Sequence, residues 1–75
     1  MYPENLRKRM SLFPSLEWPQ QRKVLDELNK LSCEQEGRTM REANAKRAPI
    51  EADRRRLQHL HDQQVRAWVE TINQE

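Results

Sequence analysis

Residues 19–35 read PQQRKVLDELNKLSCEQ and contain the clearest periodic pattern of the chain. Pro19 suits the first turn of a helix, where its missing N–H would have had no helical partner. The apolar residues that follow recur every three or four positions, which is the spacing of one helix face. These residues are Val24, Leu25, Leu28 and Leu31. The stretch therefore predicts an amphipathic α-helix that begins near residue 19.

Gly37 leaves two interpretations of where this helix ends. A glycine after the last turn is a common end signal, but a glycine can also lie inside a helix at a cost of about 1 kcal/mol. Residues 38–47 are again strong helix formers, so we expect the helix to continue to residue 46. Pro49 should then break the chain at Arg47 and Ala48, because the residue before a proline avoids the helical conformation.

A further helix is expected over residues 49–73. Its large apolar residues lie within one broad face at about 100° per residue, together with His61 and Gln64. A turn at Arg47 and Ala48 would place residue i opposite roughly residue 95 − i in an antiparallel pair. Large apolar groups would then gather at the end far from the turn. They include Ile50, Leu57, Leu60, Val65, Trp68 and Ile72.

The N-terminal part predicts a short helix over residues 3–12. Leu6, Met10 and Phe13 share one face, and Pro14 prevents the helix from continuing. We therefore expect an all-α fold: a helical hairpin of two longer helices with a short N-terminal helix packed on its apolar base. Residues 1–75 would form a single domain, with 1–18 as N-terminal helix and connector and 19–75 as the hairpin.

Composition limits how much the chain can bury. Of its 75 residues, 35% are hydrophobic and 35% are charged, with a mean hydropathy of −1.19. We expect marginal stability and association with a partner or a second copy. The chain begins at Met1, shows no targeting segment and has one cysteine, Cys33. We therefore expect a complete, cytoplasmic protein.

Basic residues gather around the expected turn. Seven of them against three acidic residues give residues 38–56 a net charge of +4. Three interpretations remain: a solvated helix surface, a dock for an acidic protein, or a nucleic-acid contact. No aromatic residue lies among them to stack on bases. The seven are Arg38, Arg41, Lys46, Arg47, Arg54, Arg55 and Arg56.

The apolar base has two interpretations, a plain core or a core that continues into an exposed interface. Aromatic residues are enriched at the centres of protein interfaces, and the low apolar content favours an interface. Its candidate residues are Phe13, Leu16, Trp18, Trp68 and Ile72.

Neither a metal, a cofactor nor catalysis is expected. His59 and His61 would point about 200° apart on a helix, and zinc sites want four ligands at close paired spacing. No glycine-rich loop, zinc-protease motif or nucleophile elbow is present.

We therefore expect a small interaction protein that acts on a partner protein, in a regulatory or inhibitory role, by occluding or bridging it. By analogy only, short chains of this kind are frequent among phage and mobile-element accessory proteins. The alternatives are a nucleic-acid-binding protein that uses the basic hairpin tip, and a structural homodimer.

Overall fold

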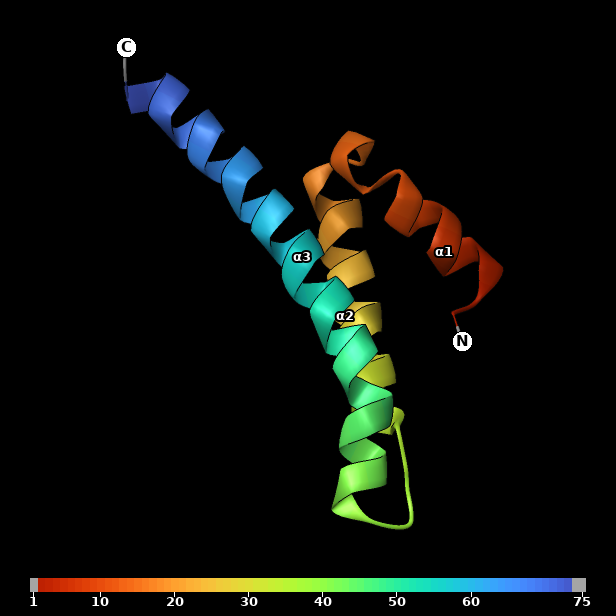
Figure 1. Cartoon of the computed structure of the whole chain (residues 1–75). Coiled ribbons are helices and arrows are strands. Elements are labelled where there is room, and N and C mark those ends of the chain that lie inside the picture. The colour runs from red at the N-terminus through yellow and green to blue at the C-terminus, as the bar shows by residue number, and fades with distance from the viewer. Residues whose placement is uncertain (1, 74–75) are drawn as a thin grey trace.

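The computed structural model describes residues 2–73, which form helices and no strand. The helices are α1 (Glu4–Ser11), α2 (Trp18–Glu34) and α3 (Met40–Asn73), with the short 3-10 helix η1 (Phe13–Ser15) between α1 and α2. The expected all-α class is confirmed. α2 and α3 run antiparallel side by side, and the N-terminal segment packs at the end where α2 begins (Figure 1). The molecule is elongated, measuring 55 × 24 × 14 Å.

The connection between α2 and α3 is the loop 35–39, and the expected turn at Arg47 and Ala48 is wrong. α2 ends at Glu34, so the expected continuation through Gly37 is wrong as well. The cross-helix hydrogen bonds join Ser32 to Glu51 and Gln21 to Gln64. The register is therefore shifted by roughly ten residues from the expected one.

Local capping explains why α3 begins at Met40. The Thr39 hydroxyl accepts a hydrogen bond from the Glu42 N–H at 3.1 Å, while the Glu42 carboxylate accepts one from the Arg38 N–H at 2.7 Å. This reciprocal arrangement is a variant of the capping box, which satisfies N–H groups that have no helical partner. Position 37 requires a glycine for steric reasons, because a Cβ there would lie 2.7 Å from the Ala43 nitrogen.

Pro49 lies inside α3 and does not break it. Its missing N–H leaves the Ala45 carbonyl without its helical donor, but Ala45 is exposed and water can serve that carbonyl. A proline inside a helix costs about 3 kcal/mol. Contacts on both sides of the proline offset this cost, because Arg47 reaches the carbonyl of Gln35, just after α2, and Glu51 accepts from Ser32 in α2.

The core runs along the α2–α3 pair and continues under α1 and η1. Half-buried Tyr2, Met10, Leu16, Leu31 and Leu60 pack around it. Each fully buried side chain of this size contributes about 1.5–3 kcal/mol relative to an exposed one. The buried apolar residues are Leu6, Phe13, Val24, Leu25, Leu28, Ile50 and Leu57.

Candidate functional site

Gln21 ties three segments together near the start of α2. Its side chain is fully buried, and its Nε2 donates to the Phe13 carbonyl at 2.9 Å and to Gln64 Oε1 at 2.8 Å. The Leu16 carbonyl lies 3.2 Å from the same nitrogen and shares one of its two hydrogens. Gln21 Oε1 lies 2.7 Å from His61 Nδ1, which must carry the proton because an amide oxygen only accepts. The network fixes η1 and α3 against α2.

Two tryptophans and His61 pack edge to face beside this network. The Trp18 ring lies 5.5 Å from the Trp68 ring at an angle of 89°, and 6.2 Å from the His61 ring at 76°. Such perpendicular pairs are a favoured aromatic geometry. Trp18 is half-buried, whereas 54% of Trp68 remains exposed. Trp68 is thus fixed on one side and accessible to a partner on the other.

An apolar ledge follows from the unequal lengths of the two long helices. α3 continues past the start of α2 and diverges from it at its C-terminal end (Figure 1). Of the five large apolar side chains that are exposed within residues 2–73, three lie on this end of α3: Trp68, Val69 and Ile72, at 54%, 41% and 46%. We define the apolar ledge by these three residues with half-buried Trp18 and Val65.

The ledge carries no charge of its own. Arg66 and Glu70 are the charged residues among positions 65–73, and each lies two positions from Trp68. Two positions on a helix correspond to about 200°, so both side chains point away from Trp68, although Arg66 lies only about 60° from Val69 and borders the ledge. A hollow of about 580 Å³ beside Trp18 and His61 adjoins the ledge.

The five expected interface residues separate into two groups in the structure. Phe13 is fully buried in the core, and Leu16 is half-buried against it. Trp18, Trp68 and Ile72 lie on the ledge. Val69 was missed by the sequence reasoning, although it directly follows Trp68 and lies within one turn of Ile72.

The seven basic residues do not form one tip. Lys46 Nζ donates to the Glu36 carbonyl at 2.8 Å, and Arg47 Nη2 makes a long contact of 3.5 Å with the Gln35 carbonyl. These two side chains satisfy carbonyl groups just beyond the end of α2, where positive charge also suits the helix dipole. Arg38 lies in the loop and Arg41 in the first turn of α3, both exposed.

Arg54, Arg55 and Arg56 lie farther along α3, about 20 Å from Arg41 at 1.5 Å per residue. Arg54 binds Glu51 at 2.9 Å. Glu51 also accepts from the Ser32 hydroxyl at 2.7 Å. The Ser32 hydrogen bond, followed by that from Arg54, lowers the pKa of the Glu51 carboxyl.

Tyr2 connects the N-terminus to the middle of α3. Its hydroxyl donates to Asp53 Oδ2 at 2.6 Å, while Arg56 lies 3.9 Å from Asp53 Oδ1. Burial, and then the hydrogen bond to Asp53, raise the pKa of Tyr2 to about 12. Asp53 therefore bonds mainly to Tyr2, and its ion pair with Arg56 is long.

Metal binding and membrane insertion are two further possibilities for residues 2–73. No group of three or more His, Cys, Asp or Glu side chains in that range is arranged to hold a metal ion. His59 and Cys33 are exposed on different helices, and His61 is engaged by Gln21. None of the helices in this range combines the length and apolar character needed to cross a bilayer.

Comparison with protein-family models, curated proteins and solved structures found no match to this chain.

Proposed function

We propose that this chain is a small interaction protein that binds a partner protein through the apolar ledge and acts on it by occluding or bridging. In this proposal the chain is a helical hairpin with a short N-terminal helix on its apolar base, and the hairpin presents the ledge. The observation that carries the proposal is the exposure of Trp68, Val69 and Ile72 on one end of α3.

The exposure of these three side chains is unusual because the chain buries most of its other large apolar residues. Only 35% of the residues are hydrophobic, and the core uses most of the large ones. Leaving three large apolar side chains exposed within one helix turn and a half forgoes stabilisation that this small chain needs. Clustered exposed apolar groups with a central tryptophan are typical of protein-binding surfaces.

Rigid support also favours a binding role. The Trp18 ring packs against one side of the Trp68 ring. Trp18 lies two residues after Leu16, whose carbonyl accepts a hydrogen bond from Gln21. A side chain that is already held in place loses little conformational entropy when a partner covers it. The ledge is therefore better prepared for binding than a frayed helix end would be.

The test is quantitative capture of partners from nuclease-treated lysate of the source cells. The ledge variant is Val69→Gln with Ile72→Gln. A matched control removes the other two exposed apolar groups, Leu12→Gln with Met40→Gln, which are 58% and 79% exposed. We expect the same protein to be captured by parent and control and to be lost with the ledge variant. Equal capture by the ledge variant would contradict the proposal.

A structural homodimer is the second candidate, favoured by the neutrality of the ledge. Two identical surfaces that meet about a two-fold axis repel each other when the surface carries charge of a single sign. The ledge has no charged member, and the two charged residues nearest to it on α3, Arg66 and Glu70, have opposite signs. Sedimentation equilibrium separates the candidates: a dimer for the parent and a monomer for the ledge variant would support the homodimer.

A further inference from the structure

The outward face of α3 carries three exposed arginines, of which only Arg56 makes an ion pair within residues 2–73, a long one of 3.9 Å with Asp53. Arg41, Arg55 and Arg56 are exposed there and lie within about 60° of one line along the helix. We call these three residues the cationic face. Between Arg41 and Arg55 the same line carries Ala45, Ala48 and Ala52, all exposed. The face is therefore flat between its charges and allows another molecule to approach the helix backbone closely.

The acidic residues of this segment are occupied elsewhere. Glu42 accepts from the Arg38 N–H, Glu51 from Ser32 and Arg54, and Asp53 from Tyr2. Within residues 2–73, Arg41 and Arg55 make no ion pair. The carboxylates remain charged, so residues 38–56 keep a net charge of +4, with Arg41 and Arg55 outside the ion pairs of residues 2–73.

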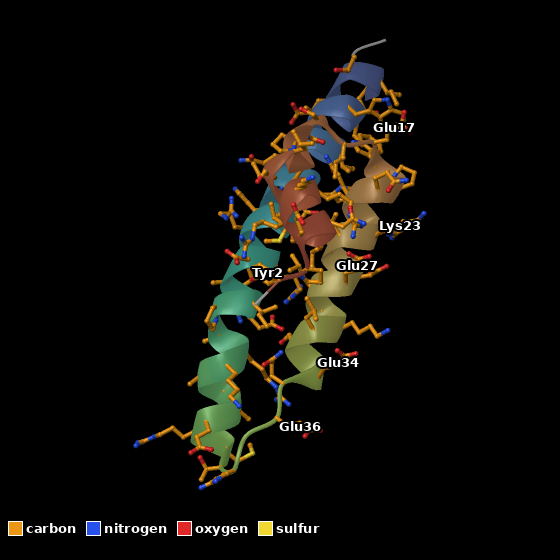
Figure 2. The ribbon with its side chains drawn as sticks, turned by 90° about the vertical axis from the view of Figure 1, so that its right-hand side faces the viewer. Tyr2, Glu17, Lys23, Glu27, Glu34 and Glu36 are labelled. Carbon is orange, nitrogen blue, oxygen red and sulfur yellow. The ribbon has the colours of Figure 1, made fainter. Side chains whose placement is uncertain are left out.

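The two long helices differ in the charge they present. Figure 2 views the α2 side, where Glu27, Glu34 and Glu36 point away from α3. The cationic face lies on α3 instead and ends before Arg66, since Asp62 and Glu70 lie one turn to either side of that residue. The cationic face is therefore confined to the first half of α3, while exposed Lys23 and Lys30 place further positive charge on α2.

We propose that the cationic face binds the phosphate backbone of double-stranded DNA. Arg55 and Arg56 are consecutive and point about 100° apart, on either flank of the alanine line. The major groove of a duplex, about 12 Å wide, accepts an α-helix and has a phosphate backbone along each edge. A helix in that groove can direct Arg55 to one strand and Arg56 to the other, with the alanines toward the floor.

A duplex fits this face better than an acidic protein or a single strand does. Protein interfaces are centred on apolar or aromatic anchors, and the cationic face has none. Single-stranded nucleic acid is held by stacking on aromatic side chains, which the face also lacks. Phosphate binding needs neither, because it comes from charge neutralisation and counterion release. This inference is independent of the ledge.

The test measures binding to a fluorescent DNA duplex of about 20 base pairs by anisotropy, at about 50 and 200 mM salt. Three phosphate contacts predict that the affinity of the parent falls roughly 40-fold between these salt concentrations. Arg41→Gln with Arg55→Gln should bind more weakly and retain only a three- to fourfold dependence, since about one contact remains. Circular dichroism checks that the variants stay folded.

The matched control is Lys23→Gln with Lys30→Gln, which removes two charges from exposed positions on α2. We expect it to bind nearly as well as the parent. The proposal is overturned if the control weakens binding as much as the arginine variant, or if the parent does not bind at roughly 100 µM protein, the weak limit of non-specific binding. It is also overturned if a polyglutamate peptide displaces the labelled duplex as well as unlabelled duplex does, which would assign the face to an acidic protein.

Discussion

Replacing Gln21 with methionine should destabilise the fold while nearly conserving side-chain volume. The substitution removes the only side-chain donor that the buried Phe13 carbonyl has within residues 2–73, and also a bond to the Leu16 carbonyl. The Phe13 carbonyl keeps the Leu16 N–H as a donor at 3.1 Å, so the substitution removes hydrogen bonds without leaving that carbonyl unpaired. Each lost hydrogen bond contributes about 0.5–1.5 kcal/mol to stability. Since Leu16, His61 and Gln64 are only half-buried, water can replace part of their loss. We expect the free energy of unfolding to fall by about 1–3 kcal/mol.

That loss would be large for this chain, because proteins of its size have a free energy of unfolding of about 4–11 kcal/mol. Urea denaturation followed by far-ultraviolet circular dichroism measures it. Gln20→Met is the control, since Gln20 is exposed in the same turn and its replacement should change stability by less than about 0.5 kcal/mol. If Gln21→Met is as stable as Gln20→Met, the network around Gln21 does not hold η1 and α3 in place.

Three further substitutions test other features. Trp68→Ala should cost about 1–2 kcal/mol in urea denaturation, below the roughly 3–5 kcal/mol of a buried tryptophan, because 54% of it is exposed. Pro49→Ala should raise the free energy of unfolding by about 2 kcal/mol, since it restores a helical hydrogen bond; an unchanged or lower value would place the proline outside a regular helix. Tyr2 is the one tyrosine, and its absorbance titration should have a midpoint of about 12, with Asp53→Asn moving it toward 10.0. Because the folded pKa is raised, this stabilisation is fully present below pH 10.0 and is lost as the pH rises through about 12.

The sequence was sufficient for the helical class and for the N-terminal helix. Periodic apolar residues predict helices reliably when proline marks their ends, as Pro14 does after α1. The expected range 3–12 therefore agrees closely with the observed Glu4–Ser11. The start of α2 beside Pro19 followed from the same kind of signal.

The turn between the long helices was misplaced because two local signals were weighted wrongly. Thr39 and Glu42 have the spacing of a capping box, which marks a helix start and agrees with Gly37 as the end of the preceding helix. Pro49 was treated as a break, but the cost of a helical proline is local. Contacts spread over α2 and α3 exceed it, and those contacts depend on tertiary structure that periodicity does not reveal.

The sequence predicted only part of the candidate site, again because tertiary contacts determine the rest. Trp68 and Ile72 were predicted from residue type and from their place on one helix face at the apolar base. Their exposure follows from the observed register, which leaves the end of α3 beyond α2. The pairing of Glu51 with Ser32 and of Asp53 with Tyr2 joins residues distant in the chain. These long-range hydrogen bonds influence which arginines remain available to bind a ligand. Local sequence patterns do not predict them.

The two faces of α3 have a consequence for how ligands would influence each other. The apolar ledge lies on the side of α3 that continues the core, and the cationic face lies on the opposite side of the same helix. A ligand on one face makes no contact with the other. The coupling free energy between the two ligands should therefore be close to zero. A protein on the ledge and a duplex on the cationic face would bind simultaneously, each with the affinity it has alone.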